Sequence, residues 1–373
     1  GKIDKKLIPV LVGCVFSFSS RLIFKYDGTI LFNHPLISNL LASIFRIITV
    51  IPYIIFQIRL IKSNYNRDKM ENYNDINYIY TNTELIAKKG ITRGKYIYIF
   101  LSSLIYFIQG SLLFFTIKVR TNLYIWNILI TCLFSQLIFK IKLFKHHYLS
   151  IILIILTGII LDLITENLQN DISNNLSQIF MRFIREIIFS LHDIVVKYAI
   201  DVKFCSIYEL AAFNGLIVTI LFLIFSVFSY YYFKLDNFEE YFLNFNNTEL
   251  LVCFGYMITQ LGFYLSTLFT NRDNTPCHIF IIYIFAQIAY YIDFSVYSIY
   301  VIICLIFILF LSLIFNEIIE INCWGLSENT KRNIIQRADT EEFFIRKNTT
   351  IEDEKTVSRC EITIELEEND VYE

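Results

Sequence analysis

The chain has 373 residues and a formal net charge of −2; 55% of its residues are hydrophobic, 17% are aromatic and only 18% are charged. Soluble domains carry about 25% charged residues. This composition, with a mean hydropathy of +0.54, therefore argues against a large soluble domain.

Ten long apolar segments follow one another along the chain. About 20 apolar residues in a helix cross the hydrocarbon core of a bilayer, and a helix satisfies its own backbone polar groups there. The apolar runs are continuous and do not alternate, which argues against a β-barrel. We therefore expect an all-α membrane protein with ten transmembrane helices, at 7–24, 36–58, 96–117, 121–139, 148–164, 178–200, 207–233, 250–270, 275–292 and 295–321.

Basic residues alternate in density between the two sides that these spans define. The loop 59–95 and the turn 140–147 are rich in lysine and arginine, whereas the opposite side holds Lys25, Lys118, Arg120 and Lys234. The positive-inside rule then predicts cytosolic N- and C-termini. Glycosylation sequons at Asn175 and Asn246 fall on the other side. An endomembrane, Golgi or endoplasmic reticulum, and the plasma membrane all fit this topology.

Ten spans divide into two halves of five. An odd number of helices per half inserts the halves in opposite orientations, which is the inverted-repeat logic of secondary transporters. The expected organisation is a first repeat at 1–164, which includes the cytosolic loop 59–95, a second repeat at 165–321, and a polar, partly disordered cytosolic tail at 322–373.

The sixth span carries an unusual stripe of polar side chains. At about 100° per residue, its members fall within an arc of roughly 80°: Arg182, Glu186, Ser190, Asp193 and Lys197. The spacings Arg182/Glu186 and Asp193/Lys197 allow ion pairs within the helix. The stripe is expected to face the bundle interior, either as two structural ion pairs or as direct contacts for substrate or protons.

Arg46 lies near the middle of the second span. A guanidinium there needs an acid, backbone carbonyls or an anionic ligand, and phosphate suits it because it binds oxyanions through two donors. A structural partner such as Glu209 or Glu186 is the alternative. Gln109 and Asn214 are further candidate contacts for a substrate, although interhelical hydrogen bonding explains them equally well.

Signs of an enzyme, a metal site or a disulfide framework are weak. The chain has no HExxH, P-loop or GxSxG motif, and its eight cysteines form no CxxC pair. The pair His146-His147 is interpreted as a surface feature of a loop, since no third ligand is nearby in the sequence. No cofactor or metal is therefore expected.

Two passages resemble a known family. Residues 134–162 read FSQLIFKIKLFKHHYLSIILIILTGIILD, where a span ends in a basic turn and a helix with a late glycine follows. Residues 189–220 read FSLHDIVVKYAIDVKFCSIYELAAFNGLIVTI. Both are similar to passages of the drug/metabolite transporter superfamily, which includes nucleotide-sugar transporters and EamA-like proteins. The resemblance implies ten helices in two inverted repeats, a central cavity and alternating access.

Together these features predict a secondary-active transporter of a polar organic solute, with nucleotide sugars or related metabolites as the favoured class. The alternative is a polytopic scaffold or receptor that does not transport. The expected partners are a small-molecule substrate and the lipid bilayer, with a homodimer possible and no nucleic acid. The candidate substrate contacts are Arg46, Gln109, Arg182, Glu186, Asp193, Lys197 and Asn214.

Overall fold

A computed structural model describes residues 5–26, 35–59, 94–116, 125–140, 143–167, 176–229, 231, 247–292, 296–319 and 330. Within these ranges the chain is helical and contains no strand. The predicted loop 59–95 lies outside them except at its ends, as does the predicted tail 322–373 except for Thr330. Asn175 and Asn246 of the sequons also lie outside the described residues.

Each of the ten predicted apolar segments contains a described helix. Short 3-10 turns, η1 (Lys5–Leu7) and η6 (Pro276–His278), lead into two of these helices. The α-helices are α1 (Ile8–Tyr26), α3 (Pro35–Arg46), α6 (Lys95–Thr116), α7 (Trp126–Phe139), α8 (Lys145–Asn167), α9 (Leu176–Asp201), α10 (Ile207–Phe228), α12 (Asn247–Asp273), α13 (Ile279–Tyr291) and α14 (Val296–Phe315).

The second segment changes its geometry at its centre. The α-helix α3 ends at Arg46, a 3-10 turn η2 (Ile47–Thr49) follows, and the chain is α-helical again as far as residue 59. Pro52 has no N–H to bond the carbonyl of residue 48, and its ring crowds that carbonyl. Pro52, about one turn beyond η2, thus accounts for the 3-10 geometry directly after Arg46.

Five helical stretches in the described part of the chain are long and apolar enough to cross a membrane: Lys5–Ile23, Leu36–Arg59, Lys145–Ile164, Ile207–Phe228 and Leu250–Asp273. Shorter apolar helices lie at Trp126–Phe139, Pro276–Tyr291 and Ile299–Phe315. Helix α9 has 26 residues, but its charged side chains make it more polar than the five stretches named above. The prediction of a helical chain with membrane-length apolar helices is confirmed.

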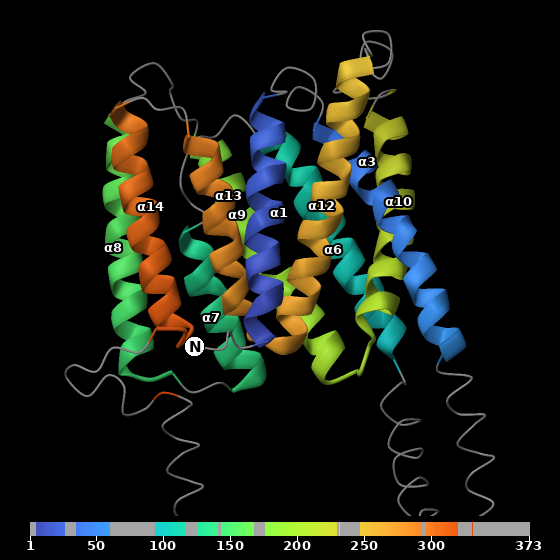
Figure 1. Cartoon of the computed structure of the whole chain (residues 1–373), viewed down its shortest axis with the longest axis horizontal. Helices are drawn as coiled ribbons and strands as arrows, with labels where there is room; N and C mark the ends of the chain where they lie inside the picture. The colour runs from blue at the N-terminus through green and yellow to red at the C-terminus, as the bar shows by residue number, and fades with distance from the viewer. Residues whose placement is uncertain are drawn as a thin grey trace, which may run out of the picture.

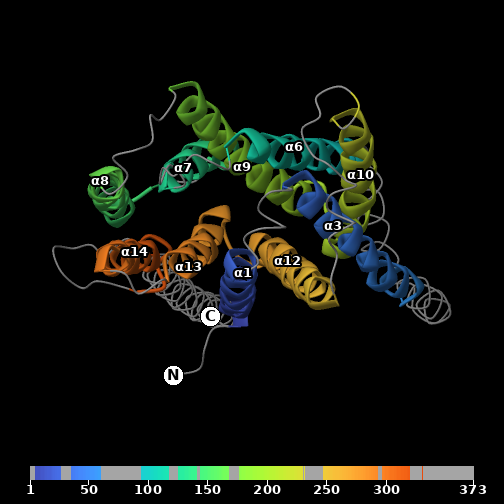
Figure 2. The ribbon, with the colours of Figure 1, turned by 90° about the horizontal axis from the view of Figure 1, so that it is seen from above.

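The helices stand side by side and roughly parallel to one another (Figure 1). Viewed along their axes they form two facing rows, α8, α7, α9 and α6 in one and α14, α13, α1 and α12 in the other (Figure 2). Helices α3 and α10 pack on each other at the end of the rows beside α6 and α12. The most extensive contacts join α1 to α12 and α13, α9 to α6, α8 to α14 and α3 to α10.

Apolar side chains fill the spaces between the helices and also cover their outer faces. Ile128, Ile154 and Leu305 are fully buried in a cluster between α7, α8, α13 and α14. Ile97 and Leu137, by contrast, are more than two-thirds exposed. Such exposure is unusual for a soluble monomer and is expected of helices that face lipid.

Candidate functional site

Arg46, the last residue of α3, is buried, and its guanidinium lies against two aromatic rings. Its side chain is only 1% exposed. The guanidinium carbon lies 4.1 Å from the ring centroid of Tyr106 on α6 and 3.9 Å from that of Tyr264 on α12, and one terminal nitrogen donates to the Tyr106 hydroxyl. Cation–π attraction is strongest where water is excluded, so both rings stabilise the buried charge.

The two rings do not satisfy all the donors of Arg46. Nε and one terminal nitrogen are buried without a hydrogen-bond partner among the described residues. Nor does any carboxylate in the described ranges form an ion pair with this arginine. A buried guanidinium with unused donors is costly, and an anion would satisfy them.

The two acids considered as structural partners of Arg46 lie in other ion pairs. Glu209 Oε1 is 2.7 Å from Lys95 Nζ, and Glu186 Oε1 is 3.2 Å from Arg182 Nε. Neither forms an ion pair with Arg46. Glu209 also belongs to the cap of α10, because the Ser206 hydroxyl accepts from the Glu209 N–H in the Ser-x-x-Glu pattern of a capping box.

Helix α9 confirms one of the two predicted ion pairs and contradicts the other. Arg182 and Glu186 pair as expected. Lys197, however, lies 3.0 Å from Asp201 Oδ2 and donates to the Asn271 carbonyl at 2.6 Å. The flexible lysine stem carries its charge towards the more exposed end of the helix, and therefore away from Asp193.

Asp193 is paired instead with its neighbour in the chain. His192 Nδ1 is 3.3 Å from Asp193 Oδ1, and both side chains are buried. The His192 ring packs edge-to-face with Tyr106, with 5.5 Å between ring centroids. Tyr106 thus contacts both Arg46 and His192. The contact between His192 and Tyr106 could not be predicted, because residue spacing along the sixth span contains no information about α6.

Gln109 on α6 and Asn214 on α10 are both buried. Asn214 is fully buried, and neither of its amide atoms has a partner within the described ranges; Gln109 Oε1 is likewise unsatisfied. Gly215 follows Asn214 and contacts the backbone of Arg46, since a Cβ built there would lie 2.9 Å from Arg46 C and Cβ. Both side chains are therefore buried amides with unused hydrogen-bonding atoms.

The structure divides the predicted site residues into three places. Arg46 contacts Tyr106 directly, and Asp193 is linked to that ring through His192. Gln109 lies one turn further along α6, and Asn214 precedes Gly215 in α10. Arg182 and Glu186 form a second group with Arg185. Arg185 interacts electrostatically with Arg21 of α1 and with Tyr106 of α6, so this group adjoins the first. Lys197 lies at the junction of α9 and α12. The sequence did not identify Tyr106 and Tyr264 as the rings around Arg46.

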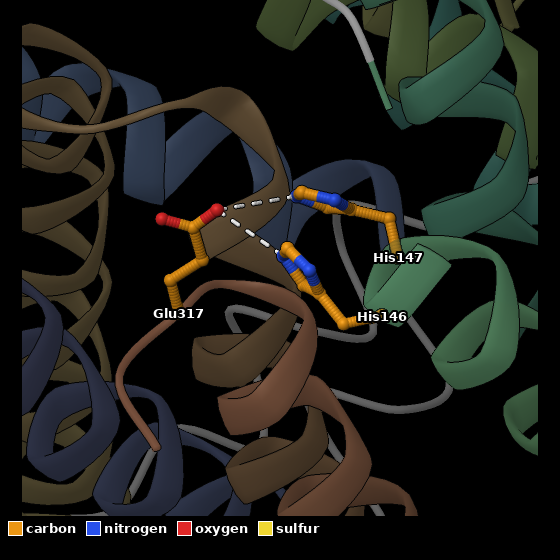
Figure 3. A group of neighbouring side chains, drawn as sticks. All are labelled: His146, His147 and Glu317. Carbon is orange, nitrogen blue, oxygen red and sulfur yellow. Dashed lines mark hydrogen bonds and ion pairs between the residues drawn. The ribbon is translucent and has the colours of Figure 1, made fainter. Parts of the chain in front are cut away.

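The histidine pair His146-His147 is not on an exposed loop, and that interpretation was wrong. Both residues lie in the first turn of α8, and His146 is 3% exposed. Their side chains converge on Glu317, just beyond α14 (Figure 3). Glu317 Oε1 is 3.1 Å from His146 Nε2 and 3.9 Å from His147 Nε2, so a third possible metal ligand is present.

Hydrogen bonding at His147 disfavours a metal at this cluster. The Phe144 N–H donates to His147 Nδ1 at 3.1 Å, so neutral His147 carries its proton on Nε2, the atom that faces Glu317. A metal at Nε2 needs that lone pair, and a ligating histidine normally donates from its other nitrogen. The arrangement fits a hydrogen-bonded clamp between α8 and α14 better than a metal site.

Glu317 holds its carboxylate there in a backbone conformation that favours glycine. Its φ is 57°. The Ile318 N–H bonds the Leu313 carbonyl, and the Glu317 N–H bonds the Ile314 carbonyl, which together form a Schellman C-cap. A glutamate in this left-handed backbone conformation is strained. Holding the Glu317 carboxylate next to His146 therefore costs conformational free energy.

No protein-family model matches this chain, and no curated protein matches it either. The features that indicate a function are therefore the geometry around Arg46 and the packing of the helices.

Proposed function

We propose that this chain is a multi-pass membrane transporter of the drug/metabolite type that moves a polar organic anion by alternating access. The observation that carries the proposal is Arg46, a buried guanidinium with unused donors, no ion pair among the described residues, and a contacting ring from each helix row. An anionic group on the substrate would complete this site.

The packing of the helices supports two inverted halves. Numbered in order, the ten helices pair as first with sixth, α1 with α9, and so on to fifth with tenth, α8 with α14. Exchanging each helix for its counterpart turns the α1–α12 contact into α9–α6, and these two are about equally extensive. It turns α1–α13 into the less extensive α9–α7 contact and α13–α14 into the slight α7–α8 contact, so the exchange is approximate. The α3–α10 and α8–α14 contacts map onto themselves. Inverted repeats pack in this way around an axis in the membrane plane.

The substrate class follows from the chemistry of the site together with the resemblance. A guanidinium binds phosphate oxygens through two donors, tyrosine rings stack on flat groups, and buried amides such as Asn214 can bind hydroxyls. A nucleotide sugar or a related phosphate-bearing metabolite presents all three. The proposed topology keeps both termini in the cytosol, in an endomembrane or the plasma membrane, and no enzymatic reaction is proposed.

A second candidate function is a polytopic scaffold or receptor that does not transport. The ion pairs Arg182–Glu186 and Lys95–Glu209 favour it, because each neutralises a charge that the first proposal leaves without a role. Arg46 is the residue that distinguishes the two proposals, since a scaffold gains nothing from an unsatisfied buried cation.

Counterflow in proteoliposomes tests the proposal against a panel of labelled nucleotide sugars, nucleotides and small metabolites. Arg46→Gln removes the charge and keeps a polar side chain. Arg59→Ala is the matched control, because it removes an arginine from the exposed end of the same helical stretch. Thermal unfolding confirms that the variants are folded.

Saturable counterflow of one substrate, lost in Arg46→Gln and retained in Arg59→Ala, is the expected result. Folded wild-type protein that exchanges nothing on the panel would overturn the proposal and favour the scaffold.

A further inference from the structure

We propose that Arg185 of α9 is a second anion-binding residue of the Arg46 site, so that the site selects a substrate with two linked phosphoryl groups over one with a single phosphoryl group. This inference rests on the proposed function, because it requires Arg46 to bind an anion. It adds the number of anionic groups that the substrate must present, which a single guanidinium leaves open.

The position of Arg185 on α9 directs its side chain towards the facing row of helices. At about 100° per residue, Arg185 lies between Phe189, about 40° to one side, and His192, about 20° to the other. The Phe189 ring packs against Tyr283 of α13, with 4.6 Å between ring centroids. The His192 ring packs against Tyr106 of α6 at 5.5 Å. Helices α6 and α13 belong to opposite rows (Figure 2), so Arg185 lies on the face of α9 that looks into the bundle.

Tyr106 relates Arg185 to Arg46. The Arg46 guanidinium carbon lies 4.1 Å from the centroid of this ring and one nitrogen donates to its hydroxyl, while Arg185 interacts electrostatically with the same tyrosine. Tyr256 of α12 interacts electrostatically with both Tyr106 and Arg46. It interacts in the same way with Arg21 of α1. Guanidinium groups from three helices, α1, α3 and α9, therefore adjoin one pair of tyrosines.

The acid next to Arg185 in the chain is shared with another arginine. Glu186 Oε1 forms an ion pair with Arg182 Nε at 3.2 Å. Arg185 itself has no ion pair within the ranges that the structure describes, and its Nε is buried there without a hydrogen-bond partner. One carboxylate thus serves two arginines of α9, and it leaves one positive charge without a partner.

Two further acids in the bundle lie against other groups. Asp193 is about two turns of α9 beyond Arg185, and its Oδ1 is 3.3 Å from the ring nitrogen Nδ1 of the preceding histidine. Asp162 of α8 interacts electrostatically with Tyr291, the last residue of α13. Neither acid forms an ion pair with Arg46 or Arg185. Both guanidinium charges are therefore left for a ligand to neutralise.

Two guanidinium groups on separate helices match a ligand whose negative charge is divided between two places. Each guanidinium can bind one phosphoryl group through two donors. In a diphosphate diester, which is the linkage of many nucleotide sugars, each phosphoryl group carries one negative charge. A monophosphate concentrates its charge on one group and leaves the second guanidinium unpaired, which is costly in a buried setting.

Calorimetric titration of the purified full-length protein with inorganic pyrophosphate and with inorganic phosphate tests this inference. The two anions differ by one phosphoryl group and carry no base or sugar, so the comparison does not depend on the identity of the transported solute. Arg185→Gln removes the guanidinium and keeps a polar side chain. Arg59→Gln is the matched control, because it removes an arginine from the exposed end of the second apolar segment. Thermal unfolding confirms that each variant is folded.

Wild type and Arg59→Gln are expected to bind pyrophosphate more tightly than phosphate by about tenfold to a hundredfold, which is the contribution of hydrogen bonds to a charged group. Arg185→Gln should lose most of this preference, and Arg46→Gln should bind both anions weakly. The ratio of the two affinities is the readout, since a change in the fold or the loss of a distant positive charge weakens the binding of both anions together.

Equal affinity of the wild-type protein for the two anions would overturn the inference without any variant, so the test holds even if Arg185→Gln does not fold. A full preference for pyrophosphate in folded Arg185→Gln would also overturn it. In both cases Arg46-dependent counterflow would leave the proposed transporter standing. Failure of pyrophosphate to bind in an Arg46-dependent way would overturn this inference, and absent counterflow would in addition remove the proposed function.

Discussion

Substituting Gly215 by alanine tests the close approach of α10 to α3 at Arg46. The added Cβ would lie 2.9 Å from both C and Cβ of Arg46 and 3.1 Å from its carbonyl oxygen. Carbon atoms prefer separations of about 3.5–4.0 Å. Two of the three opposing atoms belong to the backbone, so the helices must separate to accommodate the methyl group.

The loss of stability expected in Gly215→Ala is best judged against the same substitution at a second glycine. Overpacking of this kind costs about 1–3 kcal/mol, whereas replacing a helical glycine by alanine gains up to about 1 kcal/mol in helix propensity. At Gly255 on α12 the same Cβ would meet only Ile23 Cδ1, at 3.6 Å, which is an ordinary contact. Gly255→Ala is therefore the matched control, and the two variants should differ in stability by about 1–3 kcal/mol.

The assay is thermal unfolding of both variants and wild type in one detergent. We expect Gly255→Ala to unfold at or above the wild-type temperature and Gly215→Ala to unfold clearly below Gly255→Ala. Equal unfolding temperatures for the two alanine variants would refute the close contact between Gly215 and Arg46.

Two further predictions concern stability, each measured by the same unfolding assay. Glu317→Gly should be more stable than Glu317→Gln by about 1 kcal/mol, because both lose the carboxylate next to His146 but only glycine relieves the left-handed backbone; the opposite order would contradict the strain. Lys95→Met should destabilise by about 3–5 kcal/mol because it leaves Glu209 buried and unpaired. Adding Glu209→Gln to Lys95→Met should recover part of that loss, and additive losses would show that the two side chains do not interact.

The apolar segments were predictable because a helix in a bilayer needs only length and apolarity, and both are visible in the sequence. The change of geometry after Arg46 was not predicted, although Pro52 was the signal for it. The polar stripe of α9 was also visible, since it follows from the helical period. Within that stripe the Arg182–Glu186 pair was predicted correctly and the Lys197 partner was not, because two acids lay four residues from the lysine on opposite sides.

The rest of the candidate site depends on contacts between helices. Tyr106 is 60 residues from Arg46 in the chain, and no spacing in the sequence relates them. The same limit applies to Glu317, which is 171 residues from His146. With many tyrosines in the chain, nothing in the sequence distinguishes those that stack on a buried cation from those that face lipid.

The two rings around Arg46 come from opposite rows of the bundle, Tyr106 from α6 and Tyr264 from α12. Any movement that draws the rows apart must remove one ring from the guanidinium and open that face to water or to a solute. The hydration of a single side chain is thereby tied to the relative position of the two rows. Arg46 would then act as a sensor of the conformational state of the whole bundle.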